Sequence, residues 1–171
     1  MKTFIHPLAL VETDQIGSDT KIWAFAHVMA GAVIGADCNI GDHAFVETGA
    51  TIGNGVTIKN NVLIWKGIHI ADYAFIGPNV VFTNDRRPRS PRMPLIKRKK
   101  PSETDWLVET LVEEGASIGA NATILPGLRL GKYCMLGAGS VVTKDVAAFE
   151  LVAGNPARVV GKVDKSGKRV A

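Results

Sequence analysis

The sequence predicts an all-β fold, a parallel β-helix of six-residue repeats, and three observations predict it. Large apolar residues recur at every sixth position, over residues 4–82 and again over 112–142. Four positions after each of them stands a small or apolar residue, and the position directly after is often Gly. A period of six fits neither an α-helix nor a two-faced strand. It fits a triangular coil of three hexapeptides, in which each side is a short strand with its large and small residues pointing inward.

The first series of large residues runs without a gap through the first half of the chain: Phe4, Leu10, Ile16, Ile22, Val28, Ile34, Ile40, Val46, Ile52, Ile58, Ile64, Ile70, Ile76 and Phe82. Coils of 18 residues stack at the β spacing of about 4.8 Å, so the backbone amides of one coil can pair with the next. A helical alternative fails, because the 18 Gly residues would cost about 0.8–1 kcal/mol each relative to Ala. Coils are therefore expected over 4–84 and 112–147.

Residues 85–111 break the repeat. They contain four of the eight prolines, and proline cannot donate to a strand ladder. We expect a long loop extruded from the coil, of a kind that often carries function on a rigid scaffold. After residue 147 the series ends, and 148–171 is interpreted as a C-terminal cap with a basic tail. The length of 171 residues fits one domain, so we expect 1–171 to form a single β-helix domain.

The positive charge is concentrated in the loop. Residues 85–100 hold eight Lys and Arg against Asp85 alone, a local +7, whereas the whole chain carries +4 and the remainder therefore −3. A uniformly basic, nucleic-acid-coating protein is excluded, and no aromatic residues interleave the run. The segment could hold the phosphates of a sugar nucleotide, or it could be a solvated strap on a neighbouring chain.

The remaining composition indicates a cytoplasmic location. No secretory signal and no run of 18 apolar residues is present, so no membrane span is expected. Cys38 and Cys134 have no metal-type spacing and fall in the inward small-residue column. We interpret them as reduced core residues and not as nucleophiles.

Two motifs carry a resemblance to a known superfamily. The segment GASIGANATILPGLRLGKYCMLGAGSVVTKDV and the later GNPARVVG resemble the hexapeptide acyltransferases, and the likeness covers about residues 4–161. The resemblance implies a left-handed β-helix, which periodicity alone does not give. It also implies acetyl-coenzyme A as cosubstrate and a homotrimer with active sites in the clefts between neighbouring chains.

A third segment narrows the acceptor. IWKGIHIADYAFIGPNVVFTNDRRPRS is similar to enzymes that N-acetylate nucleotide-linked amino sugars. Its Phe-Thr-Asn at 82–84 and Pro-Arg-Ser at 88–90 resemble the 3-N-acetyltransferases of dTDP-3-amino-3,6-dideoxyhexoses, which would feed surface polysaccharide synthesis. Enzymes for UDP-linked 3-amino uronates share the Phe-Thr-Asn and stay an alternative. Enzymes for 4-amino sugars usually add an N-terminal α/β domain, which we do not expect here. Two further hypotheses are a small-molecule acetyltransferase on the same scaffold and a non-enzymatic scaffold.

The resemblance assigns five residues to coenzyme A. Ala120 and Ala138 stand 18 residues apart, and the matching positions of the family offer backbone N–H groups to the pantetheine arm. Simple packing of small side chains is the alternative. Thr143, Lys144 and Arg158 would lie near the adenosine and its 3′-phosphate, since cations suit a phosphate and Arg can bind it bidentately. A solvated basic end is the alternative for these three.

Asn84 is the main candidate for the acceptor site. It ends the last regular hexapeptide before the loop, where its amide could orient the sugar amine for direct attack on the thioester, or could begin an Asx turn. Asp85 could accept a proton or hold the sugar. The other substrate-binding candidates are Lys66 and Glu47, which would line the cleft on neighbouring coils with Trp65, and Arg86 and Arg87 of the basic loop. Relatives often carry an acid in place of Lys66, which leaves the exact acceptor open.

A general base is sought among four histidines, since histidine is the usual base near neutral pH. His27, at an outward position, is the catalytic candidate; His6, His43 and His69 rank lower. The alternative is that no protein base exists and that the leaving thiolate takes the proton. The spacings of 16 residues from His27 to His43 and 26 from His43 to His69 are not multiples of 18, so no metal site is expected.

Overall fold

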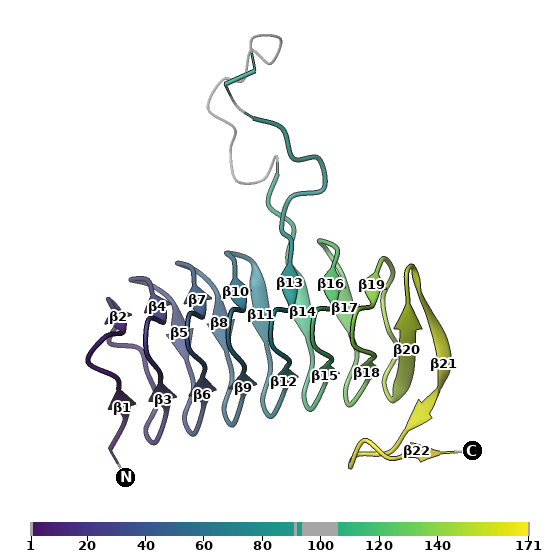
Figure 1. Ribbon diagram of the computed structural model, residues 1–171, viewed down its shortest axis with the longest axis horizontal. Coiled ribbons are helices and arrows are strands. Elements are labelled where there is room, and N and C mark those ends of the chain that lie inside the picture. Colours follow the sequence, from purple (N-terminus) through teal and green to yellow (C-terminus); the bar gives the residue numbers. More distant parts are fainter. Residues whose placement is uncertain (1, 91, 94–105, 171) are drawn as a thin grey trace.

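The computed structural model describes residues 2–90, 92–93 and 106–170, and within them the chain forms a stack of triangular coils (Figure 1). Its elements are strands, most of them two residues long, and no helix occurs among the described residues. Hence the described residues contain no helix that could cross a membrane. The observed architecture confirms the all-β coil predicted from the six-residue period. The first coil differs from the predicted column by one residue, because Ile5 and Val11 pair with the inward Ile22 and Val28. Phe4 and Leu10 are therefore exposed and do not point inward.

The strands form three sheets, the first, second and third, in which the strands of successive coils pair in parallel. The first sheet contains β1 (Phe4–Ile5), β3 (Lys21–Ile22), β6 (Asn39–Ile40), β9 (Thr57–Ile58), β12 (Phe75–Ile76), β15 (Ser117–Ile118), β18 (Met135–Leu136), β20 (Glu150–Gly154), β21 (Ala157–Val163) and β22 (Arg169–Val170). The second contains β2 (Leu10–Val11), β4 (His27–Val28), β7 (Phe45–Val46), β10 (Leu63–Ile64), β13 (Val81–Phe82), β16 (Thr123–Ile124) and β19 (Val141–Val142). The third contains β5 (Val33–Ile34), β8 (Thr51–Ile52), β11 (Ile68–Ile70), β14 (Thr110–Val112) and β17 (Arg129–Leu130).

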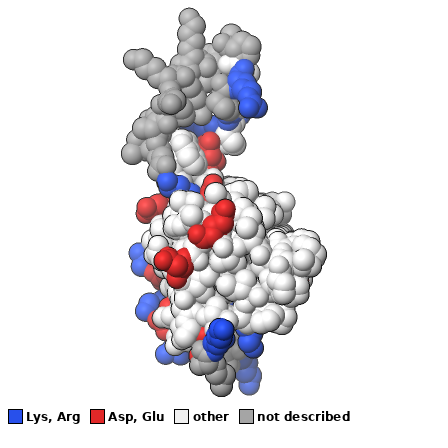
Figure 2. Space-filling view, turned by 90° about the vertical axis from the view of Figure 1, so that its left-hand side faces the viewer, with Lys and Arg blue, Asp and Glu red and all other residues white. Residues whose placement is uncertain are grey.

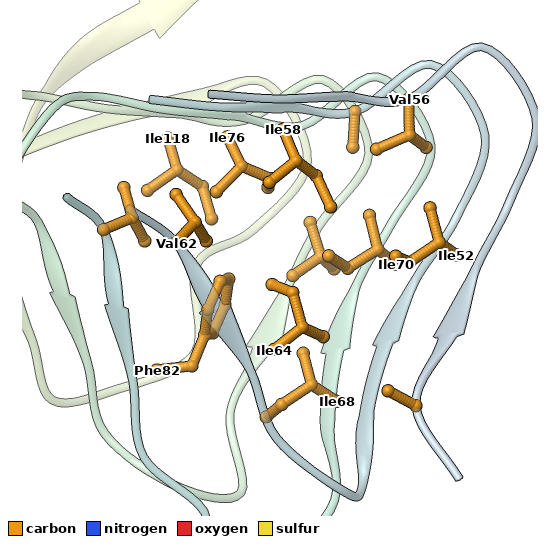
Figure 3. Packing of buried hydrophobic residues seen from close by; sticks show 14 of the residues in the cluster. Ile52, Val56, Ile58, Val62, Ile64, Ile68, Ile70, Ile76, Phe82 and Ile118 are labelled. Atoms are coloured by element: carbon orange, nitrogen blue, oxygen red, sulfur yellow. The ribbon is translucent and has the colours of Figure 1, made fainter. Parts of the chain in front are cut away.

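The interior is a continuous column of aliphatic side chains (Figure 3). Ile58, Ile76 and Ile118, from three successive coils, lie in a row and are fully buried. Cys38 and Cys134 belong to the same cluster. Burial raises the pKa of both thiols, that of Cys134 to about 12. The two cysteines are therefore core residues, as the inward column predicted.

The three corners of the coil share one turn. At most corners one residue adopts a left-handed backbone, and ten of these residues are not glycine. The corners at 83–85 and 143–145 have no such residue. The glycine that follows the large residue has a different role, which is close stacking of coils. A Cβ on Gly119, for example, would lie 2.5 Å from the backbone nitrogen of Ala138. Coils can thus approach only where that position carries no side chain.

One backbone N–H at each corner has no partner in the coil-to-coil ladder, that of the second residue after the large one. Side chains accept it at several corners, as Glu113 does for Lys132 at 2.9 Å and Asp72 does for Asn54 at 2.7 Å. Pro78 and Pro126 occupy this same position, where a missing N–H leaves the ladder intact. This outward amide is the feature of the corner that is available for binding.

The loop leaves the stack between β13 and β14 and projects away from it (Figure 1). Asp85 pairs with Leu107 in an antiparallel bridge, and the Val108 N–H donates to the Asn84 carbonyl at 3.0 Å. Strand β14 begins at Thr110, inside the range 85–111 that the sequence assigns to the loop. Ile68 pairs with Thr110, 42 residues later instead of 18, so 24 residues are inserted. Much of the basic run, including Lys97, Arg98, Lys99 and Lys100, lies outside the described residues.

The cap extends the first sheet. Strand β20 lies parallel to β18, and β21 and β22 then add antiparallel strands. Residues 150–163 therefore fold back along the last coil, which brings Arg158 close to residues 142–146.

Candidate active site

Each coil has three corners, which differ in their residues. The loop corner joins the second sheet to the third (47–49, 65–67, 83–85, 125–127, 143–145). The acidic corner joins the third to the first (53–55, 71–73, 113–115, 131–133). The alanine corner joins the first to the second (119–121, 137–139). Seen from the N-terminal end, charged side chains lie along one side and at the foot of the loop (Figure 2).

The loop corner gathers most of the candidate residues because each follows a strand of the second sheet. Glu47 follows β7, Lys66 follows β10 and Asn84 follows β13. Thr143 and Lys144 follow β19, two coils beyond Asn84. At about 4.8 Å per coil these residues form one line along the edge of the stack.

Asn84 is held at two points and is half-buried. Its Nδ2 donates to the Lys66 carbonyl at 3.1 Å, and its own carbonyl accepts from the Val108 N–H. The Asx turn at the start of the loop is formed by Asp85 instead, whose Oδ1 accepts the Arg87 N–H at 2.7 Å. Among the described residues nothing donates to Oδ1 of Asn84, which therefore remains available as an acceptor.

A cavity of about 540 Å³ opens between the loop base and the corner beside Asn84. Arg86 enters it from the loop, and its guanidinium lies against Gly127. The aliphatic side of the cavity belongs to the next coil. The lining residues are Thr83, Asp85, Arg86, Pro88, Leu125, Pro126, Leu128 and Thr143. We call this cavity the groove.

A second cavity of about 220 Å³ adjoins the groove at Thr143. It brings together Thr143, Lys144 and Arg158, the three residues that the resemblance assigns to the adenosine end of coenzyme A. Arg158 reaches it from β21, where its Nη1 donates to the Ala157 carbonyl at 2.9 Å. The two cavities share Thr143, so this pair of cations lies next to the groove, whose lining includes Thr83 and Asp85 on either side of Asn84.

Ala120 and Ala138 lie elsewhere, on the alanine corner. The Ala120 carbonyl accepts the Gly139 N–H, while the N–H groups of Ala120 and Ala138 have no acceptor among the described residues. The two alanines thus present adjacent outward amides, but the second sheet separates them from Asn84 and Lys144. One chain does not bring all five cofactor candidates to one surface.

The side chains of Lys66 and Glu47 do not point toward Asn84. The stem of Lys66 packs over Gly49, where an added Cβ would lie 3.4 Å from Lys66 Cγ. The Glu47 Oε2 accepts the Lys66 N–H at 2.7 Å. Trp65, half-buried and not an outward anchor, donates its Nε1–H to the Phe82 carbonyl at 3.1 Å. The contacts of these three residues stabilise the loop corner in the coils that precede Asn84.

Within the described residues none of the four histidines is hydrogen-bonded to Asn84. His27 lies on β4, three coils away, which is about 14 Å along the stack, and it contacts Glu12 at 3.2 Å. His43 stacks on Phe25. His69 follows the loop corner on β11, and its Nδ1 is 2.7 Å from the Thr51 hydroxyl. No group of three or more potential metal ligands occurs in the described part of the chain.

Some lining residues were missed by sequence reasoning. Leu125 and Leu128 belong to a regular hexapeptide, so their pattern signals only packing. Thr110 is fully buried, and its hydroxyl accepts the Gly127 N–H at 3.0 Å. A polar residue in the inward column, directly after the loop, was a signal that could have identified it.

Comparison with known proteins gives consistent matches. The model of the family "bacterial transferase hexapeptide (six repeats)" matches residues 15–48, 49–84 and 109–144, and it omits the inserted segment. The chain is 50% identical over 160 residues to dTDP-3-amino-3,6-dideoxy-alpha-D-galactopyranose 3-N-acetyltransferase of Aneurinibacillus thermoaerophilus. The aligned region covers 94% of this chain and 78% of that relative.

Two solved structures share the fold. One is a variant of AntD, an N-acyltransferase from Bacillus cereus in complex with dTDP and coenzyme A, with 17% identity, a TM-score of 0.57 and coverage of 96% of this chain and 80% of that one. The other is PerB from Caulobacter crescentus in complex with coenzyme A and GDP-perosamine, with 21% identity, a TM-score of 0.51 and coverage of 94% and 58%. Both support the fold.

Proposed function

Because this chain belongs to the bacterial transferase hexapeptide family, of left-handed parallel β-helix fold, we propose that it is an acetyl-coenzyme A-dependent N-acetyltransferase. The acceptor is the 3-amino group of a dTDP-linked 3-amino-3,6-dideoxyhexose. The observation that carries the proposal is the 50% identity, over 94% of the chain, to a transferase of that substrate class. The open acceptor oxygen of Asn84 beside the groove supplies a site for the amine.

The two adjoining cavities support one orientation of bound acetyl-coenzyme A. Lys144 and Arg158, which line one cavity, would bind the 3′-phosphate of coenzyme A, because charge-assisted hydrogen bonds to phosphate are strong. The thioester would then lie in the groove, between Leu125 and the base of the loop at Thr83 and Asp85. Thr143, shared by both cavities, would lie along the connecting arm.

A homotrimer is part of the proposal, because the cofactor candidates of one chain occupy two corners. The outward amides of Ala120 and Ala138 would face the loop corner of a neighbouring copy and bind the pantetheine arm there. The outward face of the second sheet supports such packing, since it is largely apolar and includes exposed Leu10, Leu63 and Val81. We further propose that the chain acts as a single unit in the cytoplasm.

The chemistry is a direct transfer. Oδ1 of Asn84 accepts a hydrogen bond from the neutral amine and so directs its lone pair at the thioester carbonyl. The N–C bond forms, the C–S bond of the tetrahedral intermediate breaks, and the ammonium proton passes to the departing coenzyme A sulfur. Positioning of the two reactants supplies much of the rate. No histidine among the described residues is hydrogen-bonded to Asn84, so we propose no protein base.

An acyl-enzyme is not part of this route. Cys38 and Cys134 are buried, and the raised pKa values of their thiols disfavour the thiolate. Asp85, engaged with the Arg87 N–H, stabilises the turn that places Arg86 at the groove. Arg86 and the exposed Arg87 are the residues that we propose to meet the diphosphate of the acceptor.

A coenzyme A release assay with acetyl-coenzyme A tests this function. The acceptors are dTDP-3-amino-3,6-dideoxyhexoses, a UDP-3-amino uronate, a dTDP-4-amino sugar and serine. We expect turnover with a dTDP-3-amino sugar alone. Turnover only with the uronate or with serine would overturn the acceptor, and coenzyme A release from none of the four would overturn the enzymatic proposal.

A further inference from the structure

The amide of Asn84 can have only one orientation at the loop corner. The atom that faces the Lys66 carbonyl at 3.1 Å must be Nδ2, because two acceptors cannot form a hydrogen bond. Oδ1 is consequently directed away from the corner. The position of the Lys66 carbonyl therefore decides where the catalytic acceptor oxygen lies.

Glu47 holds the residue that carries this carbonyl. Its Oε2 accepts the Lys66 N–H at 2.7 Å, a short charge-assisted bond to the one corner amide that the coil ladder leaves unpaired. Lys66 is followed by Gly67, whose backbone is left-handed with φ of 81° and which carries no side chain to restrain it. The bond to Glu47 thus restrains the corner residue whose carbonyl sets the amide of Asn84.

The acidic corner has the same bond at a place that does not contact Asn84. The Oε2 of Glu113 accepts the Lys132 N–H at 2.9 Å, with the same 19-residue separation. Both glutamates are half-buried. Glu113 also pairs with Arg129, so its removal costs at least as many contacts. Only at the loop corner does the restrained residue accept a side chain of the proposed active site.

We propose that Glu47 is a positioning residue, which orients the Asn84 amide through the main chain of Lys66 and does not bind the sugar. The inference rests on the proposed function. It predicts that what matters at position 47 is an acceptor oxygen at this distance, with or without charge.

Steady-state kinetics of four variants test the relay. Glu47→Ala should lower kcat about tenfold, because misplacement of a reacting group by about 1 Å can cost up to 100-fold, and should leave the KM for acetyl-coenzyme A within about twofold. Glu47→Gln keeps an acceptor and should retain at least about half of kcat. Glu113→Ala is the matched control and should keep wild-type kcat. Glu47→Ala added to Asn84→Ala should cost less than about twofold, because both changes act on one unit.

Three kinetic results would overturn the inference. They are wild-type kcat in Glu47→Ala, an equal loss in Glu47→Gln, and a full further loss when Glu47→Ala is added to Asn84→Ala. The last two would indicate direct contact with the substrate.

A measurement without substrate separates this inference from the proposed function. Solvent exchange of the Asn84 side-chain amide protons can be followed by NMR in the wild type, Glu47→Ala and Glu113→Ala. We expect about tenfold faster exchange in Glu47→Ala alone, since the bond to Lys66 opens more often. Unchanged exchange would overturn the relay, whatever the activity of the wild type.

Discussion

The loop corner and the acidic corner use the same turn for different ends. Each has a Glu that accepts the main-chain N–H of a Lys in the next coil, Glu47 for Lys66 and Glu113 for Lys132. At the acidic corner the other polar side chains are also engaged with one another. The Tyr133 hydroxyl donates to Glu114 at 2.6 Å, which lowers the pKa of Glu114 and raises that of Tyr133.

At the loop corner the polar network is incomplete. Asn84 donates one hydrogen bond and keeps its Oδ1 open among the described residues, and aliphatic side chains line the adjoining groove. The difference coincides with the insertion of 24 residues between β13 and β14. A repeat that satisfies its own polar groups makes a scaffold, and an interruption of the repeat leaves groups free for chemistry.

The largest expected effect tests whether only the loop corner is catalytic. Asn84→Ala should lower kcat by about 100-fold, which corresponds to about 2.7 kcal/mol of transition-state stabilisation. Asn54→Ala, which removes an amide that accepts the Ala36 N–H at the acidic corner, should leave kcat unchanged. Steady-state assays of both variants make the comparison, and equal losses would erase the distinction between the corners.

The next largest effect concerns Thr110, the first residue of β14 after the inserted loop. Thr110→Val removes the hydroxyl that accepts the Gly127 N–H and should lower the free energy of unfolding by about 2 kcal/mol, since a half-buried donor loses its partner. Thr110→Ser should be much milder. Denaturant titration at fixed protein concentration measures both, and an unchanged midpoint for Thr110→Val would show that water replaces the hydroxyl.

A smaller effect is expected for Arg158, which lines the second cavity. Arg158→Ala should raise the KM for acetyl-coenzyme A about tenfold, because one charge-assisted contact to phosphate is lost. The wild type should discriminate against acetyl-dephospho-coenzyme A, and the variant should do so less, because only Lys144 would still contact the 3′-phosphate. Discrimination as strong as in the wild type would place the 3′-phosphate away from Arg158.

The smallest expected effect concerns the reactivity of the two buried cysteines. With a pKa of about 12, Cys134 would be thiolate at a fraction of only about 10⁻⁴ at pH 8. The raised pKa of Cys38 acts in the same direction. Alkylation by iodoacetamide, followed by mass spectrometry, should label neither cysteine in the native protein and both after unfolding. Rapid native labelling of either would show that the coil opens there.

The sequence predicted the coil because its large residues repeat in six, but it did not fix the phase of the coil across the loop. Ala120 stands 36 residues after Asn84, a multiple of 18, so an uninterrupted helix would place both at one corner. The 24 inserted residues correspond to four hexapeptides, whereas one coil contains three. The insertion therefore shifts the repeat by one side of the triangle, and Ala120 lies at the alanine corner instead. The length of the insertion follows from the pairing of Ile68 with Thr110, which the repeat itself does not show.

The periodicity also could not predict the roles of individual side chains. The period correctly stacks Glu47, Lys66 and Asn84 on neighbouring coils. It cannot tell whether a carboxylate reaches outward to a ligand or sideways to a corner amide, because both directions are open to an outward position. The Glu47 bond to the Lys66 main chain follows from the unpaired corner N–H, which only the turn geometry reveals.

A structure determined with coenzyme A and a dTDP-3-amino-3,6-dideoxyhexose bound tests the central claim most directly. We expect the sugar amine within hydrogen-bond distance of Asn84 Oδ1, and the coenzyme A sulfur in the groove beside Leu125. A sugar bound at the acidic corner, or an amine held by another side chain with Asn84 still bonded only to Lys66, would contradict it.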